Sequence, residues 1–145
     1  MKIIIGSDHA AFNEKEMIKK YLSSKGHQVE DVGPNSEARC NYPDYAMKVA
    51  RGVVKQQCIG VLLCGSGIGV SIVANRFKGI RAALVRTVEE AELCKQHNNA
   101  NILCMGGRIS TERELKAMVD AWLAAKFEDG RHAERIALFN DLGIE

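Results

Sequence analysis

The sequence predicts an α/β protein built on a five-stranded parallel sheet. Five short segments of strand length, most of them apolar, alternate with longer segments whose apolar residues recur at helical spacing. The third apolar segment, residues 59–64, leads directly into a glycine-rich turn and then into another helical segment. Such alternation is typical of a three-layer α/β/α sandwich of the Rossmann-like kind, in which helices cover both faces of a parallel sheet.

Size and composition indicate a single domain, residues 1–145. The chain has 145 residues, of which 46% are hydrophobic, enough for one packed core. A net charge of +2, from 20 basic and 18 acidic residues, is too balanced to indicate a nucleic-acid or membrane-surface partner. The five cysteines are scattered and form no C-x-x-C pair, which argues against zinc or thioredoxin chemistry. With no signal-like or membrane-spanning run, we expect a cytoplasmic protein with reduced thiols.

Apolar patterning and turn signals predict the first two strands and the helix between them. Residues 2–6 form a β-branched run, which predicts a strand. Residues 10–24 carry an apolar stripe at helical spacing, and Gly26 suits the position just after a helix end. A second strand is predicted over residues 27–32, where Gly33 and the proline after it mark a turn.

The middle of the chain predicts a loop, two helices and the third strand. Residues 35–43 are polar and rich in turn formers, which predicts a loop. Residues 45–57 have helical spacing, and residues 59–64 are a continuous apolar run typical of a buried strand. A helix is expected over residues 70–77, after the glycine-rich turn.

The last third of the chain predicts two more strands, over residues 81–85 and 102–105. The helix expected over residues 87–97 opens with Thr-x-x-Glu, a capping-box pattern, and the helix that starts at Thr111 opens in the same way. A final helix is predicted over residues 132–142.

The glycine-rich turn after the third strand predicts an anion-binding site. Residues 64–69 read Cys-Gly-Ser-Gly-Ile-Gly. A strand-to-helix turn of this kind presents backbone N–H groups and the positive end of a helix dipole. Because this environment favours a thiolate, Cys64 is a candidate reactive group. The alternative is a tight turn that needs small residues only for packing.

Three nucleotide- and phosphate-binding motifs are excluded at this turn. The dinucleotide fingerprint G-x-G-x-x-G would need glycine at position 70, and a C-x5-R phosphatase loop would need arginine there, but the residue is Val70. A Walker loop would need Gly-Lys followed by Ser or Thr, which does not occur here. With these motifs excluded, the turn predicts binding of a small phosphorylated or oxyanionic ligand.

Polar residues follow other predicted strands as well. Asp8 and His9 follow the first strand, and Arg108 follows the fifth. Ligands of open parallel sheets bind at the carboxyl ends of the strands, so these side chains are candidates for the same site. For Asp8 and His9, capping of the next helix is an equally good interpretation.

The remaining candidates lie near helix ends. His97 and Asn98 end a predicted helix, where a solvated C-terminal cap is the simpler role for the histidine. Arg131 and Arg135 are spaced i, i+4 and share a helix face, which suits a phosphate. Pairing with Glu128 and the acidic residues near it is the alternative for these arginines.

The combination of motifs resembles one family. The order and spacing are similar to those of ribose-5-phosphate isomerase type B, a sugar-phosphate isomerase family that also includes galactose-6-phosphate and allose-6-phosphate isomerases. The resemblance covers residues 2–135 and rests on Gly6-Ser7-Asp8-His9, Asn41-Tyr42-Pro43-Asp44, Cys64-Gly65-Ser66-Gly67-Ile68-Gly69, Ala74-Asn75, Gly79-Ile80-Arg81-Ala82, His97-Asn98, Asn101-Ile102-Leu103, Gly106-Gly107-Arg108 and Gly130-Arg131-His132.

The resemblance implies an aldose–ketose isomerase of the pentose phosphate pathway that interconverts D-ribose 5-phosphate and D-ribulose 5-phosphate through an enediolate. It implies Cys64 as the catalytic base, His97 as the ring-opening acid and Ser66 as part of an oxyanion hole, with no cofactor and no metal. The implied substrate-binding residues are Asp8, His9, Tyr42, Gly65, Ser66, Gly67, Ile68, Gly69, Asn98, Arg108, Arg131 and Arg135.

The resemblance also implies an assembly. Relatives of this kind are dimers or tetramers with shared sites, so we expect a homodimer or tetramer in which His97, Asn98 and Arg108 reach the Cys64 of a neighbouring copy. The final helix, residues 132–142, is expected to pack at the subunit interface.

Two alternatives stay open. One is a hexose-6-phosphate isomerase with the same chemistry, acting on allose 6-phosphate or galactose 6-phosphate, with a deeper pocket provided by residues 35–44. The other is a non-catalytic sugar-phosphate-binding protein, which predicts a missing base or acid, whereas Cys64 and His97 are both present. One branch of the family uses a later glutamate as its base, and Val70 occupies that position here.

Overall fold

The computed structural model describes residues 1–145 and confirms the predicted fold class. Five parallel strands form one sheet in the order β2-β1-β3-β5-β4. The strands are β1 (Lys2–Ser7), β2 (Gln28–Asp31), β3 (Ile59–Cys64), β4 (Ala82–Leu84) and β5 (Ile102–Gly106). The helices are a short 3-10 turn η1 (His9–Ala11), then α1 (Phe12–Ser24), α2 (Tyr42–Gln56), α3 (Ile68–Ala74), α4 (Val88–Gln96), α5 (Glu112–Ala124) and α6 (Arg131–Ala137).

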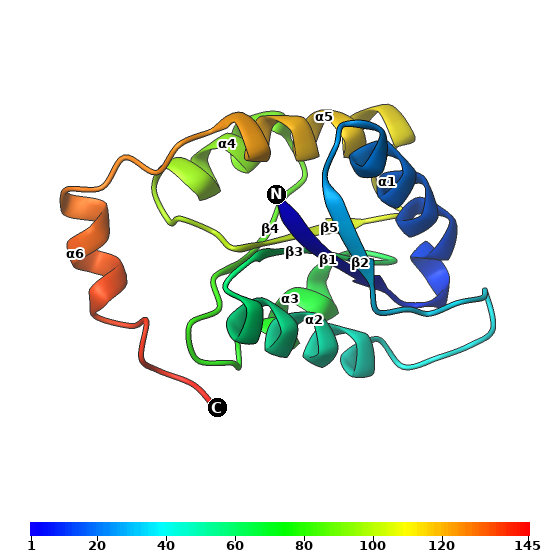
Figure 1. Cartoon of the computed structure of the whole chain (residues 1–145), viewed down its shortest axis with the longest axis horizontal. Helices are drawn as coiled ribbons and strands as arrows, with labels where there is room; N and C mark the ends of the chain where they lie inside the picture. The colour runs from blue at the N-terminus through cyan, green and yellow to red at the C-terminus, as the bar shows by residue number, and fades with distance from the viewer.

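The helices form two layers around the sheet (Figure 1). α1, α4 and α5 cover one face, and α2 and α3 cover the other. Because successive strand residues point to opposite faces, Ile3 and Ile5 pack in the first core and Ile4 in the second. The central strands β1, β3 and β5 are almost wholly buried, as the continuous apolar runs predicted, whereas the outer strands β2 and β4 are largely half-buried.

Three differences from the prediction concern α2, α4 and the C-terminal helix. α2 begins at Tyr42, inside the predicted loop, because Pro43 occupies the first turn, where its missing N–H costs nothing. At the start of α4, Thr87 caps the Glu90 N–H, but the Glu90 carboxylate accepts from the Arg86 N–H, so no reciprocal capping box forms. The box at Thr111 is confirmed.

The third difference is the C-terminal helix. α6 ends at Ala137 and not near residue 142, and the residues after it turn back toward the end of α3. There Lys78 N–H donates to the Ile144 carbonyl at 2.8 Å and Ile144 N–H donates to the Arg76 carbonyl at 2.9 Å. The end of the chain is thereby tied to the α3–β4 connection. No helix has both the length and the apolar character needed to cross a bilayer.

The sheet topology decides where a site can form. β1 lies between β2 and β3, so the direction of strand order reverses beside it. The turns after β1, β3 and β5 meet at this point and are joined by backbone hydrogen bonds. Asp8 N–H donates to the Leu63 carbonyl at 3.2 Å, and Gly107 N–H donates to the Cys64 carbonyl at 2.9 Å.

Candidate active site

A cavity of about 500 Å³ opens at the carboxyl ends of β1, β3 and β5. Most of the residues that line it belong to the predicted site, and the full lining is Asp8, His9, Ala10, Tyr42, Cys64, Gly65, Ser66, Gly69, Arg108 and Ile109. Three strand ends and the start of α2 therefore bring one part of the predicted site together within one chain.

Cys64 is the last residue of β3 and forms the inner wall of this cavity. Its side chain is buried, and its Sγ accepts a hydrogen bond from the Gly67 N–H at 3.1 Å. A donor directed at the sulfur stabilises negative charge there, as a thiolate base requires. The turn needs glycine at position 67, because φ is 78° and a Cβ would lie 2.8 Å from the Met105 carbonyl carbon.

The other buried cysteines have a different environment. Burial raises the pKa of Cys94 to about 11, and burial also raises the pKa of Cys104 strongly. Neither thiol lines the cavity, and both remain protonated near neutral pH. Cys64 is therefore the thiol that the fold presents to a ligand.

The turn that follows Cys64 supplies hydrogen-bond donors. The Ser66 Oγ accepts from the Ile68 N–H at 3.2 Å, which leaves its hydroxyl hydrogen free to donate. The N–H groups of Gly65 and Ser66 donate to no acceptor in the protein. These donors beside a buried sulfur suit an oxygen that gains negative charge.

Asp8 and His9 have structural partners as well as a place in the cavity. Asp8 Oδ1 accepts from the Ala11 N–H at 3.2 Å, so the capping interpretation is correct, and its second oxygen is left for a ligand. His9 Nδ1 lies 3.2 Å from the Cys40 carbonyl oxygen, so its Nε2 is available to the cavity. Sequence reasoning missed Cys40, since nothing in the sequence indicated that its loop would fold back onto His9.

Tyr42 and Arg108 lie on two sides of the glycine-rich turn. A Cβ at Gly69 would lie 2.7 Å from the Tyr42 ring, so the ring rests directly on that glycine. The Arg108 N–H donates to the Gly65 carbonyl at 3.0 Å, and its side chain passes close to Gly65. The expectation that Arg108 reaches a neighbour's cysteine is wrong, because it shares a cavity with Cys64 of its own chain.

The remaining predicted residues lie elsewhere. His97 caps the end of α4, and Asn98 lines a separate cavity with Arg81 and Phe139. Arg131 and Arg135 are exposed on α6, which lies beyond the amino ends of the strands, opposite the Cys64 turn (Figure 1). A single chain therefore does not bring the two groups of predicted residues together.

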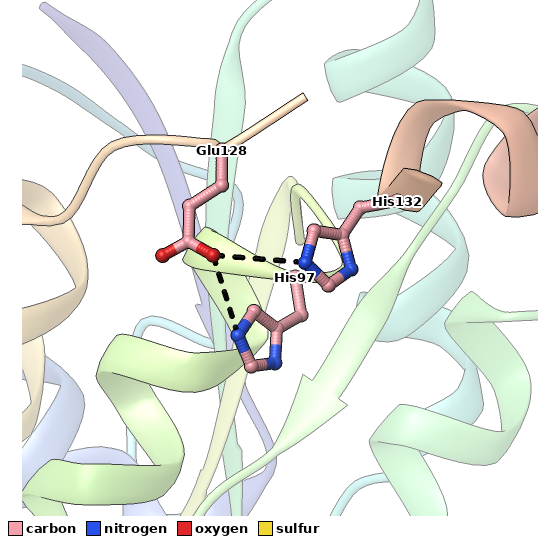
Figure 2. Close-up of side chains that lie close together, drawn as sticks. All are labelled: His97, Glu128 and His132. Carbon is pink, nitrogen blue, oxygen red and sulfur yellow. Dashed lines mark ion pairs between the residues drawn. The ribbon is translucent and has the colours of Figure 1, made fainter. Parts of the chain in front are cut away.

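His97 has two close neighbours, Glu128 and His132 (Figure 2). The two imidazole rings stack with centroids 4.4 Å apart and planes within 9°. Glu128 Oε1 lies 3.5 Å from His97 Nε2 and 3.6 Å from His132 Nε2. Sequence reasoning overlooked this cluster, although the i, i+4 spacing of Glu128 and His132 was a visible signal.

The three side chains offer ligand atoms within 4.8 Å of one another, as a metal site would. The ring geometry does not fit a shared ion, however. Stacked, nearly parallel imidazoles hold their nitrogen lone pairs in two parallel planes, whereas ligands of one tetrahedral ion must converge on a point. Burial lowers the pKa of His132, the charges of His97, Arg131 and Arg135 lower it further, and only Glu128 opposes them.

The fold and the Cys64 cavity define a parallel α/β enzyme with its site at the reversal point of the sheet. Residues 3–139 match the family model described as Ribose/Galactose Isomerase, and the chain belongs to that family. The ribose-5-phosphate isomerase B of Escherichia coli is 43% identical over 136 residues, covering 93% of this chain and 91% of its own length.

Two further relatives show the range of the family. A galactose-6-phosphate isomerase subunit of Clostridium acetobutylicum is 41% identical over 137 residues, covering 94% of this chain and 79% of its own length. The crystal structure of ribose-5-phosphate isomerase B from Mycoplasma genitalium with bound ribulose-5-phosphate has a TM-score of 0.93. Its sequence is 43% identical, and the match covers 96% of this chain and 93% of that one.

Proposed function

We propose that this sugar-phosphate isomerase interconverts D-ribose 5-phosphate and D-ribulose 5-phosphate, with Cys64 as the base. The observation that carries the proposal is the Gly67 N–H directed at the buried Cys64 sulfur, beside the unpaired N–H groups of Gly65 and Ser66. A base and an oxyanion site therefore share one cavity. Relatives named as ribose-5-phosphate isomerases, one with ribulose-5-phosphate bound, support the choice of substrate.

The chemistry follows from these positions. The Cys64 thiolate takes the proton from C2 of the open-chain aldose, and the electrons of that bond form the C1–C2 double bond as the aldehyde oxygen becomes an enediolate. Ser66 and the neighbouring N–H groups stabilise this oxygen, and one such donor is typically worth about 3–4 kcal/mol. The sulfur then returns its proton to C1 while a proton moves from O2 to O1, which gives the ketose.

Ring opening needs an acid, because ribose 5-phosphate is mostly a closed furanose. We infer that His97 donates a proton to the ring oxygen as the ring opens. Since His97 lies far from Cys64 in one chain, this role requires a second copy of the chain, and a homodimer is the simplest assembly that provides one. His97 and Asn98 of one copy then complete the Cys64 cavity of the other.

The phosphate site follows from the same assembly. His9 and Arg108 lie in the Cys64 cavity, and Arg131 and Arg135 project from α6 without an ion-pair partner. Two guanidinium groups one helical turn apart suit bidentate binding of a phosphate. With α6 of one copy against the cavity of another, all four side chains surround the phosphate end of the sugar.

A substrate comparison tests the proposal. Purified protein is assayed with ribose 5-phosphate, allose 6-phosphate and galactose 6-phosphate, with Cys64→Ala beside Cys58→Ala, which removes a thiol outside the cavity. We expect the pentose phosphate to have the highest kcat/KM and only Cys64→Ala to abolish turnover. A preference for a hexose phosphate would refute the proposed pentose substrate. That outcome would agree with the match to a galactose-6-phosphate isomerase subunit. Full turnover by Cys64→Ala would refute the base.

A further inference from the structure

α6 contributes one buried side chain to the protein. His132 is the only buried residue of this helix, while Arg131, Glu134 and Arg135 are exposed. Its ring stacks on His97, at 4.4 Å between centroids. The helix that carries the two arginines is therefore in direct contact with the imidazole at the end of α4.

Glu128 is held against the same pair. Its backbone N–H donates to the Gln96 carbonyl at 3.0 Å, which fixes the segment before α6 to the end of α4. One carboxylate oxygen then lies within 3.6 Å of both imidazole Nε2 atoms (Figure 2). The carboxylate comes from neither helix, so it can bridge α4 and α6.

Charge determines how this cluster holds protons. Two imidazolium rings 4.4 Å apart repel each other, whereas one positive ring beside one carboxylate is favoured. Burial and the charges of His97, Arg131 and Arg135 keep the pKa of His132 low. His97, whose side chain is 40% exposed against 9% for His132, is the better hydrated of the two rings.

We propose that His132 and Glu128 are positioning residues that hold the His97 imidazole in the orientation that a ring-opening acid needs. The stacked His132 ring fixes the plane of the His97 imidazole, and the Glu128 carboxylate faces its Nε2 atom. Because His132 also anchors α6, the ring-opening acid and the arginines on α6 form one unit that meets the substrate together. This inference rests on the proposed ring-opening role of His97.

The test separates ring opening from enolisation. Ribulose 5-phosphate cannot close to a furanose, because its O5 carries the phosphate, so exchange of its C1 hydrogen with D2O reports proton removal by Cys64 alone. Conversion of ribose 5-phosphate requires ring opening as well. Both rates are measured by NMR for wild type, His132→Ala, His132→Phe and Glu128→Gln, with Glu134→Gln as a control for an exposed carboxylate on the same helix.

We expect His132→Ala to slow aldose conversion about 10-fold or more, within the range of general acid catalysis, and to leave C1 exchange within about twofold of wild type. His132→Phe retains a stacking ring and is expected to recover most of the loss. Glu128→Gln is expected to slow aldose conversion and to spare C1 exchange, because the carboxylate that faces the His97 Nε2 atom is lost. Glu134→Gln should match wild type.

Other results overturn the inference. Equal losses of aldose conversion and C1 exchange in His132→Ala would mean a general structural role, and no loss in either rate would mean that the stack is irrelevant. Failure of His132→Phe to recover activity would remove stacking as the cause. A wild-type protein with neither activity would refute the proposed function itself, which is a distinct outcome from any of these.

Discussion

Mixing two inactive variants should restore activity if the site is shared between copies. Cys64→Ala damages the cavity at the carboxyl ends of the strands, and His97→Asn damages the cluster beside α6, the helix that lies beyond the amino ends of the strands. In a dimer containing one copy of each, one site has both defects and the other has an intact Cys64 facing an intact His97. Random pairing makes half of the dimers mixed, so recovery should approach about a quarter of wild-type activity.

The assay uses co-expressed variants with different affinity tags, so that mixed dimers are purified as such and assayed with ribose 5-phosphate. Purified mixed dimers should reach about half of the wild-type rate, because one of their two sites is intact. Cys64→Ala paired with Asp8→Asn is the matched control, since both changes lie in the same cavity and every mixed site keeps one defect. No recovery in the Cys64→Ala and His97→Asn pair, or equal recovery in the control, would refute a shared site.

Three further predictions concern the turn and the stability of the fold. Gly67→Ala should destabilise the protein by about 1–3 kcal/mol in urea unfolding, because its φ of 78° is strained for alanine. Gly69→Ala should raise KM several-fold by displacing the Tyr42 ring, whose nearest atoms would lie 2.7 Å from the new Cβ, and unchanged kinetics would exclude the ring from the site. Burial raises the pKa of Asp31, but its hydrogen bonds, led by the one from Lys15, outweigh burial and lower that pKa below 3.8. The stability that ionised Asp31 contributes should therefore be lost as pH falls below about 4, and Asp31→Asn should flatten that loss.

The sequence predicted the sheet well because its central strands are continuous apolar runs. β3, from Ile59 to Cys64, begins and ends where the pattern placed it. The pattern predicts too late a start for α2, because Tyr42 and Pro43 belong to a polar, turn-rich stretch, although proline is well suited to a first helical turn. The C-terminal helix was predicted too long, since its apolar residues beyond Ala137 belong to a segment that packs back on the α3–β4 connection.

The candidate site was predictable in its parts, but its geometry was not. Residues at strand ends, such as Cys64 and Arg108, can be placed from topology alone, because parallel strands share one carboxyl edge. The stack of His97 on His132 depends on the path of the chain between α5 and α6, which no local pattern encodes. The resemblance implies a site shared between copies, with His97 of one copy beside Cys64 of another, and within one chain the two residues lie in separate places.

The outer strands of the sheet restrict how copies of this protein can associate. β2 spans Gln28–Asp31 and β4 spans Ala82–Leu84, so each exposed edge offers only a few backbone hydrogen-bonding groups. Short edges of this kind are poor templates for continuing a sheet from one molecule into the next. In the proposed homodimer, contact is therefore expected through helices and side chains, which favours closed, finite assemblies over the open-ended stacking that leads to fibres.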